Sequence, residues 1–462
     1  MRGLGVARLV GLGVVAALLL LAVSLPKPPT PAGPEFAEIV ETATEVSANP
    51  SVWYCPWINS GATRDTRVVA SYLTDLDVVF THPDPRVGEP PDIGQLNLDG
   101  PGALIQDVAE IVNRGDAPGF IEFSNGPATA ATVVSSETSL SGDRCVGSSP
   151  RLWHIAGLTT RDGYGLTLRL FNPFPENAKV QVRAASELGS EALPDLQEID
   201  VVGRTWIDID VAAAIPFLDN LVLTVGTEEG VVFPTVIQQL DQEEANWSGT
   251  GLSTEWLFPA AGLAGLSPRL SVWNPGDVPI DVEVDLFGRS GGFGAVFTGT
   301  IEAGRPIDFP LADQSTGAVG VRVRATGPVA AVVVAEDVPL ETPGDDEPAE
   351  TAPRRIAGTV GSPEPALRWL LPGAGGFVGG DTSLWLLNTS GDPVTVTIQP
   401  MGRDGLSADK VRIEAASFRR IRLTPNANVF GYRIESAIPI TASWSLQTDG
   451  AVALFAGIPY EE

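Results

Sequence analysis

The chain has 462 residues and a formal net charge of −28, with 29 basic residues beside 57 acidic ones. A surface of this sign repels nucleic acid and anionic lipid headgroups, which counts against a nucleic-acid partner. The apolar fraction of 44% is enough for real hydrophobic cores and excludes a globally disordered chain.

The N-terminal 25 residues have the composition of a membrane anchor. Arg2 and Arg8 precede an uncharged apolar run of 17 residues that ends at Leu25. Basic residues before such a run place its N-terminus in the cytoplasm, and 17 residues are at the short end for a membrane-spanning helix. We expect residues 1–25 to form a single transmembrane helix that holds the protein in the cell membrane, with the C-terminal part extracellular. Cleavage as a signal peptide, which would leave a secreted protein, is the alternative.

Residues 26–50 begin with a proline-dense stretch, Pro26-Lys-Pro-Pro-Thr-Pro-Ala-Gly-Pro34. Such a composition favours extended polyproline structure, so a semi-rigid stalk is predicted here.

After the stalk, one pattern recurs at a period of about a hundred residues. A tryptophan is followed 18 or 19 residues later by an asparagine at the end of an alternating strand, and the pairs are Trp153 with Asn172, Trp256 with Asn274, and Trp369 with Asn388. Trp53 opens a fourth, more divergent copy without a clear asparagine turn. Because solenoid repeats are mostly shorter, a unit of this length is a small domain copied in tandem.

The repeat predicts the domain boundaries. We expect four repeats, with a charged and proline-broken linker before the last one, at residues 51–150, 151–250, 251–339, 340–353 (the linker) and 354–462. The linker accounts for the longer interval between Trp256 and Trp369, which is 113 residues where the earlier intervals are 100 and 103.

Each repeat contains about seven short segments in which apolar residues alternate with polar ones. Examples are Val180-Gln-Val-Arg183 and Val282-Glu-Val-Asp285. A period of two with one apolar side is typical of a half-buried antiparallel strand, and no segment has a helical period of useful length. The predicted fold is all-β, with four tandem immunoglobulin-like or fibronectin-like β-sandwich repeats behind the N-terminal transmembrane helix.

The repeated residues are predicted to be structural. Trp53, Trp153, Trp256 and Trp369 occupy one position of the repeat and are expected in the sandwich cores. Asn172, Asn274 and Asn388 are expected in the turn between two strands. The tryptophans that do not all repeat are better candidates for an exposed binding face: Trp57, Trp206, Trp247, Trp273, Trp385 and Trp444.

Cys55 and Cys145 are the only cysteines, and they lie near the two ends of the first repeat. Two cysteines in an exported chain most often pair, so a disulfide between them is predicted. A metal site would need more soft ligands than the chain has.

Motifs for catalysis are few. Gly288-Arg-Ser290-Gly-Gly292 matches a nucleophile elbow, but the same place in the last repeat has Asp404, which indicates hairpin turns in both. The two histidines, His82 and His154, are too few for an ordinary zinc cluster or a supported nucleophile–histidine dyad. The Asp-x-Asp pairs at 75–77 and 208–210 are weak calcium candidates. We therefore predict no catalytic residue, no metal and no cofactor.

One local motif carries a resemblance. Val52-Trp53-Tyr54-Cys55-Pro56, together with the basic and apolar N-terminus, the proline-rich stalk and the Asn-Pro strands, resembles a family of uncharacterised exported actinobacterial proteins whose domain has no known function. The resemblance extends over most of the chain after residue 50 and implies a place in the cell envelope. It supplies no catalytic residue.

These patterns together predict a non-enzymatic cell-envelope protein that presents tandem β-sandwich domains outside the membrane as a scaffold or spacer. Its expected partners are the membrane, through the N-terminal helix, and an envelope glycan or protein. The alternative is an envelope-polysaccharide-binding or adhesion module that uses the unrepeated aromatic residues. A membrane-tethered hydrolase is the third class of function.

Overall fold

The structure is a computed structural model. It describes residues 51–461 except 59–63, 84–90, 111–117, 125, 137–138, 192, 194–195, 264, 312–318, 338–353, 378–379, 403–405 and 449. The expected anchor at 1–25 and stalk at 26–50 lie outside the described residues. In the part of the chain that is described, no helix is long and apolar enough to cross a membrane.

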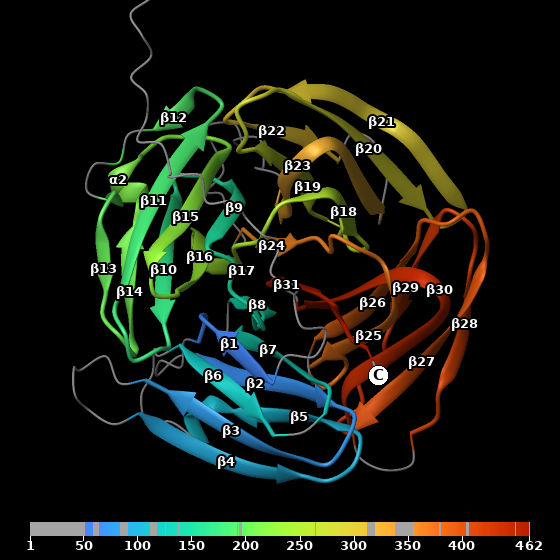
Figure 1. The fold of residues 1–462 in the computed structure, drawn as a ribbon. Coiled ribbons are helices and arrows are strands. Elements are labelled where there is room, and N and C mark those ends of the chain that lie inside the picture. The colour runs from blue at the N-terminus through green and yellow to red at the C-terminus, as the bar shows by residue number, and fades with distance from the viewer. Residues whose placement is uncertain are drawn as a thin grey trace, which may run out of the picture. The chain divides into compact units, whose positions relative to one another are not determined.

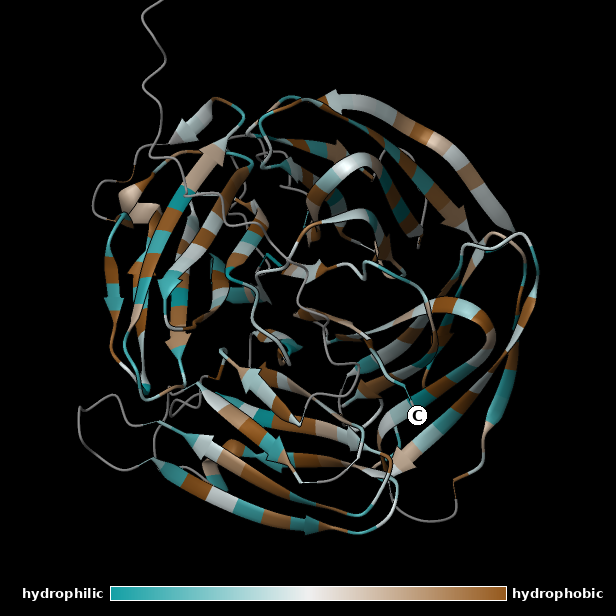
Figure 2. Cartoon of the chain, in the orientation of Figure 1, coloured by the Kyte–Doolittle hydropathy of each residue, from teal (hydrophilic) through white to brown (hydrophobic). Residues whose placement is uncertain are grey.

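The regular secondary structure of the described residues is almost entirely β-strand, which confirms the predicted all-β class (Figure 1). Hydrophobic and hydrophilic residues alternate along many of the strands, so that one side of a strand faces a core (Figure 2). The strands form four modules with one shared topology. In each module, a first sheet that begins with the tryptophan strand packs on a second sheet, and apolar side chains from both fill the space between them.

Module 1 has sheets with strand orders β1-β6-β3-β4 and β5-β2-β7-β8. Its elements are β1 (Val52–Cys55), β2 (Asp65–Tyr72), β3 (Leu76–His82), β4 (Asp92–Leu98), β5 (Gly102–Asp107), the 3₁₀ turn η1 (Val108–Glu110), β6 (Gly119–Phe123), β7 (Ala128–Ser135) and β8 (Leu140–Arg144).

Module 2 has sheets with strand orders β12-β11-β15-β9 and β14-β10-β16-β17, and β13 also pairs with β11. Its elements are β9 (Leu152–Leu158), β10 (Tyr164–Asn172), β11 (Ala178–Ser186), β12 (Gly189–Glu191), β13 (Ile199–Val201), β14 (Thr205–Asp210), the short helix α2 (Val211–Ala214), β15 (Leu221–Glu229), β16 (Phe233–Leu240) and β17 (Glu243–Ser248).

Module 3 repeats this order, but one long strand, β23, belongs to both sheets. Its first part pairs with β18 and β20, and its last part pairs with β19 and β24. The elements are β18 (Ser253–Phe258), β19 (Ser267–Asn274), β20 (Ile280–Gly288), β21 (Gly291–Ile301), β22 (Arg305–Pro310), β23 (Gly320–Glu336) and β24 (Ile356–Val360).

Module 4 also has one long strand, β30, that crosses from the first sheet to the second. The elements are β25 (Ala366–Pro372), β26 (Asp381–Asn388), β27 (Val394–Gly402), β28 (Asp409–Ile413), β29 (Ser417–Arg422), β30 (Val429–Gln447), β31 (Val452–Ala456) and β32 (Ile458–Pro459).

The shared topology corrects the immunoglobulin-like prediction. In immunoglobulin domains the strand pairs A–B, D–E and F–G each lie within one sheet. In module 2, β9, β10, β11, β14, β15 and β16 instead alternate between the two sheets, while β12 and β13 stay in the sheet of β11 and β17 stays in the sheet of β16. The modules are β-sandwiches with a strand order of their own.

The third predicted boundary is also wrong. Residues 340–353, expected as a linker between repeats, connect β23 to β24, and these two strands pair from Val332 with Val360 to Glu336 with Ile356. Ile356–Val360 therefore completes module 3 and is not part of module 4. A charged, proline-containing segment has the same composition whether it joins two domains or two strands of one sheet. Composition alone therefore could not distinguish a linker from a loop within module 3.

The last strand of each second sheet, namely β8, β17, β24 and β31, is called here a hub strand. β8 contacts β17, β17 contacts β24, β24 contacts β31, and β31 contacts β8, so the contacts form a closed cycle (Figure 1). Residues 45–462 accordingly form one compact unit. The modules are not independent domains on a string.

Close packing at the hub depends on glycine. A Cβ atom on Gly142 of β8 would lie 2.5 Å from a ring carbon of Phe455 in module 4. A Cβ atom on Gly358 of β24 would lie 2.3 Å from a ring carbon of Trp247 in module 2. Each glycine thus makes room for an aromatic ring of the neighbouring module.

Candidate functional site

The four repeat tryptophans are buried and share one hydrogen bond. Each side chain is at most 5% exposed. Each indole N–H donates to the carbonyl oxygen at the point where the chain passes from the first sheet to the second: Trp53 to Ala128 at 2.9 Å, Trp153 to Val232 at 3.1 Å, Trp256 to Val329 at 2.8 Å and Trp369 to Ile440 at 2.9 Å. A phenylalanine would fill much of the same space but leave that buried carbonyl without a donor, which explains the choice of tryptophan.

The repeat asparagines are fully buried turn residues with all their polar atoms used. The Asn172 amide donates to the carbonyls of Glu176 at 2.8 Å and Val201 at 3.1 Å, and its oxygen accepts from the Phe174 N–H at 3.0 Å. The same three bonds recur at Asn274 and Asn388. The side chain therefore closes its own turn and ties it to the end of a strand further along the chain.

Cys55 and Cys145 form the predicted disulfide. It lies beside a bridge in which Tyr54 and Val146 exchange both backbone hydrogen bonds. The bond ties the first strand of module 1 to its last.

The expectation of an exposed face made of unrepeated tryptophans is wrong. Five of the six are at most 4% exposed, and only Trp206 is partly exposed. They pack mainly where modules meet: Trp57 packs with Ile237 between modules 1 and 2, and Trp385 packs in the cluster that joins modules 3 and 4. Residues at a contact between modules differ from one contact to the next, so failure to repeat does not indicate exposure.

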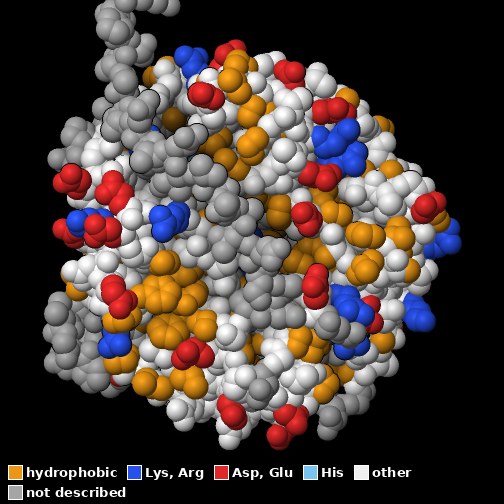
Figure 3. Space-filling view, viewed as in Figure 1, with side chains coloured by type: hydrophobic (Ala, Val, Ile, Leu, Met, Phe, Trp, Pro, Cys, Tyr) orange, Lys and Arg blue, Asp and Glu red, His pale blue; other side chains and the backbone are white. Residues whose placement is uncertain are grey.

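Exposed large apolar side chains are few in the described chain, and they include Ile93, Phe217 and Phe293 at 58%, 74% and 67%. Figure 3 shows apolar side chains gathered over the region of β1 and β6.

Phe217 is also a backbone outlier with φ of 65°. Its N–H donates to the Thr160 carbonyl at 2.8 Å, so the strained turn is held by hydrogen bonding.

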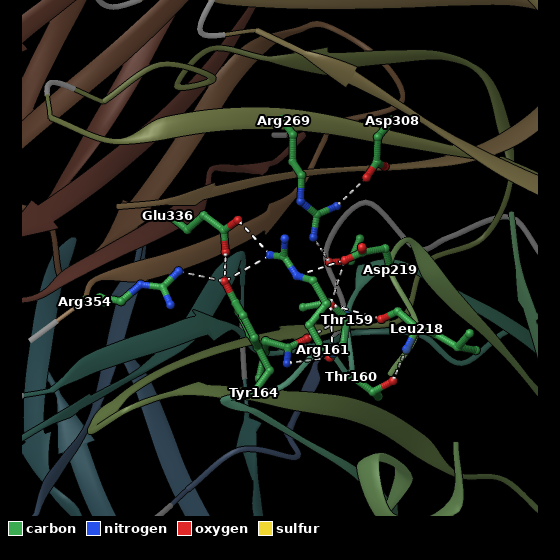
Figure 4. Close-up of polar contacts among 12 residues, drawn as sticks. Thr159, Thr160, Arg161, Tyr164, Leu218, Asp219, Arg269, Asp308, Glu336 and Arg354 are labelled. Atoms are coloured by element: carbon green, nitrogen blue, oxygen red, sulfur yellow. Dashed lines mark hydrogen bonds and ion pairs between the residues drawn. The ribbon is translucent and has the colours of Figure 1, made fainter. Parts of the chain in front are cut away.

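A cluster of polar side chains joins modules 2 and 3 and is shown in Figure 4. The Tyr164 hydroxyl donates to Glu336 at 2.6 Å and accepts from Arg161 at 3.0 Å and Arg354 at 3.1 Å. Arg161 also pairs with Glu336 at 3.1 Å and with Asp219 at 2.9 Å. Burial, followed by the bond to Glu336, raises the pKa of Tyr164, so this phenol stays protonated at neutral pH and acts as a structural donor.

Three carboxyl groups of the hub strands are buried, namely Asp143, Glu243 and Glu244, and Glu244 pairs with Arg64 of module 1 at 2.5 Å. Burial raises the pKa of Glu243 to about 8, and its oxygen accepts from the Val452 N–H of module 4 at 3.3 Å. Asp143 accepts from the Ser248 N–H of module 2 at 2.7 Å, and burial raises its pKa as well. Glu243 and Asp143 thus both accept a hydrogen bond from another module.

The motifs considered for catalysis occupy structural positions. Ser290 lies in the two-residue turn between β20 and β21, so the segment is strand–turn–strand and lacks the helix that a nucleophile elbow needs. His154 is 3% exposed, its ring lies 5.3 Å from that of Trp273, and burial lowers its pKa to about 4. His82 is buried at the end of β3.

The weak calcium candidates have structural partners. Asp208 pairs with Arg169 at 2.7 Å, Asp210 caps α2, and Asp75 accepts from the Gly100 N–H. No group of three or more potential metal ligands occurs among the described residues.

A shallow groove of about 490 Å³ lies on the outer face of module 3. Its walls include Arg324 paired with Glu283, and Thr300 bonded to Asp281 at 2.6 Å. These polar groups satisfy one another, so a ligand would have to displace existing bonds.

The fold and these residues define an all-β protein of four closely joined β-sandwich modules. Residues 108–358 match the family model described as "Family of unknown function (DUF5719)". The chain therefore belongs to this family, which agrees with the resemblance to an uncharacterised family that the sequence carries after residue 50. No curated protein matches the sequence. Among solved structures, the crystal structure of Thermotoga maritima 1070 is similar at 16% identity with a TM-score of 0.18, covering 24% of this chain and 93% of the other.

Proposed function

We propose that the chain is a non-enzymatic protein of the cell envelope, held by an N-terminal membrane helix, and that its modules form a rigid scaffold or spacer outside the membrane. The main support is the continuity of the cores between modules. The cluster around Trp153 includes Val332 and Ile356 of module 3, and the cluster around Trp369 includes Val69 and Ala131 of module 1. Modules that share apolar clusters cannot move independently of one another, as a rigid scaffold or spacer requires.

The extracellular location is supported by the disulfide, since such bonds persist in oxidising compartments. The apolar run that ends at Leu25 supports the membrane attachment. The composition of the chain after that run, which is strongly acidic, suits solubility outside the cell.

Cell fractionation tests this proposal. A tag placed after Glu462 should be found in the membrane fraction and should be digested when intact cells are treated with protease. Recovery of the tag in the cytosol, or its protection in intact cells, contradicts the proposed location.

The enzymatic alternative has its own test. Purified full-length protein should release no soluble product from isolated envelope polymers. Turnover that disappears when a single carboxylate is replaced would show a membrane-tethered hydrolase instead.

A further inference from the structure

Three arginine side chains gather where modules 3 and 4 meet. Arg420 and Arg422 lie on one face of β29, and Arg289 lies in the turn between β20 and β21, two strands that contact β29 (Figure 1). Arg289 and Arg422 are exposed, and Arg420 is partly exposed. We call these three residues the arginine cluster. Because the chain carries a net charge of −28, a local excess of positive charge needs an explanation.

The repeat shows that the charge at this position is reversed in module 4. Strand pairing with the turn asparagines aligns Asp208 of β14 and Asp308 of β22 with Arg420 of β29. Asp208 pairs with Arg169 at 2.7 Å, and Asp308 pairs with Arg269 at 3.0 Å. Modules 2 and 3 therefore neutralise this position within the chain, whereas module 4 places an arginine there.

Packing between the modules accounts for only part of this reversal. The Arg420 guanidinium lies 5.0 Å from the centre of the Trp385 ring, and its Nε donates to the Ser383 hydroxyl at 3.1 Å. These contacts hold the group in place but do not neutralise it. Module 3 adds a second positive charge, since burial and then the charges of Arg422 and Arg289 lower the pKa of Arg420. Like charges across a contact are unfavourable unless an anion lies between them.

Close packing fixes the backbone that carries Arg289. Phe287, at the end of β20, belongs to the same apolar cluster as Phe418 of β29. A Cβ atom on Gly292, just after the turn, would lie 3.1 Å from the Ala416 carbonyl oxygen. The turn therefore cannot withdraw from β29 without separating the two modules, and the site is preorganised.

The charge balance of the cluster restricts its ligand. Among the described residues, the carboxylate that pairs with the cluster is Asp381, through Arg422. Three guanidinium groups beside one carboxylate leave two positive charges. A phosphate monoester carries a charge of about −1.5 to −2 at neutral pH and offers oxygens for paired guanidinium bonds. A carboxylate or phosphodiester carries a single charge, and nucleic acid is repelled by the net charge of the chain.

We propose that the arginine cluster binds a dianionic phosphate group, either free phosphate or the monoester of a larger molecule. Arg289 and Arg420 donate hydrogen bonds to the phosphate oxygens from the two modules, and Arg422 adds its charge at the edge of the site. The ligand thereby replaces repulsion between modules 3 and 4 with attraction to a shared anion. This site goes beyond the scaffold function proposed above and does not depend on where the protein is located.

Titration calorimetry on the full-length protein in detergent tests the charge of the ligand. The probes are inorganic phosphate, methyl phosphate and dimethyl phosphate, in a phosphate-free buffer of low ionic strength. At least one of the first two should bind, and dimethyl phosphate, with its single charge, should bind about tenfold or more weakly. Methyl phosphate that binds as tightly as inorganic phosphate identifies a monoester as the ligand. Binding of inorganic phosphate alone identifies the free ion.

Single variants test the residues. Arg289→Gln and Arg420→Gln should each weaken binding by about tenfold or more, because each removes a charge-assisted contact. Arg412→Gln is the matched control, because it changes the net charge equally and Arg412 is an exposed arginine of module 4 paired with Glu414 at 2.9 Å. It should leave the affinity unchanged. Without phosphate, Arg289→Gln should raise the melting temperature, and added phosphate should raise it more in the wild type than in this variant.

Failure of both inorganic and methyl phosphate to bind the wild-type protein overturns the proposal, as does an equal loss of affinity in Arg412→Gln. Dimethyl phosphate that binds as tightly as the others would refute the argument from charge. A lower melting temperature of Arg289→Gln in phosphate-free buffer would show that Arg289 already has a stabilising partner, which also overturns it.

Discussion

The shared indole hydrogen bond predicts the cost of a small change. Trp256→Phe keeps an aromatic ring in the core of module 3 but removes the 2.8 Å bond to the Val329 carbonyl, which lies in a fully buried part of β23. A buried acceptor left without a donor costs about 1–3 kcal/mol. We therefore expect Trp256→Phe to lower the free energy of unfolding by that amount, and Trp256→Ala to lower it by about 3–5 kcal/mol.

Guanidinium unfolding followed by circular dichroism measures both changes. Trp206→Phe is the matched control, because Trp206 is partly exposed and its indole N–H donates to no buried carbonyl among the described residues, and it should change stability by less than about 0.5 kcal/mol. The shared cores also predict one cooperative transition that shifts as a whole. If Trp256→Phe proves as mild as the control, the indole bond is not what selects tryptophan. If module 3 unfolds alone, the modules are less coupled than their contacts indicate.

Three further predictions follow from single sites. Burial raises the pKa of Glu243 from 4.5 to about 8. Between these pH values the folded protein keeps a proton that the unfolded chain loses, so the free energy of unfolding of the wild type should fall as pH rises. Glu243→Gln should reduce this difference in stability, measured by unfolding at pH 5 and pH 8. Replacing Cys55 and Cys145 together by serine should cost about 4–5 kcal/mol in the same assay, because the bond closes a loop with a sequence separation of 90, and an unchanged midpoint would refute this. Gly358→Val should destabilise by at least about 1–3 kcal/mol, since its Cβ atom would lie 2.3 Å from a tryptophan ring carbon, whereas Gly299→Val, with open space around it, should be nearly neutral in melting temperature.

Several features of the fold were predictable because they depend on local patterns. Period-two alternation indicated the strands, the recurring tryptophan and asparagine indicated the repeat, and isolation of Cys55 and Cys145 indicated their bond. The contacts between modules were not predictable in this way. An apolar side chain has the same place in the sequence pattern whether it packs inside one sandwich or against a neighbouring module. Periodicity therefore could not show that Trp247 and Trp385 are buried and not on the surface.

The turn asparagines could be aligned from the sequence in three of the four copies. Aligning Asn172, Asn274 and Asn388 sets Phe174 against glycine and serine, which marks a position where module 2 departs from the other copies. Module 1 has no turn asparagine to align on, so its equivalence to the other modules is visible only through sheet pairing.

The cycle of hub strands also restricts the order in which the modules can complete their folding. β8 ends at Arg144, whereas its neighbour β31 begins only at Val452. During synthesis, the apolar side of module 1 that contacts Phe455 must therefore remain uncovered until β31 has been made. Partners so distant in sequence close slowly, and the waiting surface is prone to mispairing with other chains. Loss of β31 would thus harm module 1 as much as module 4.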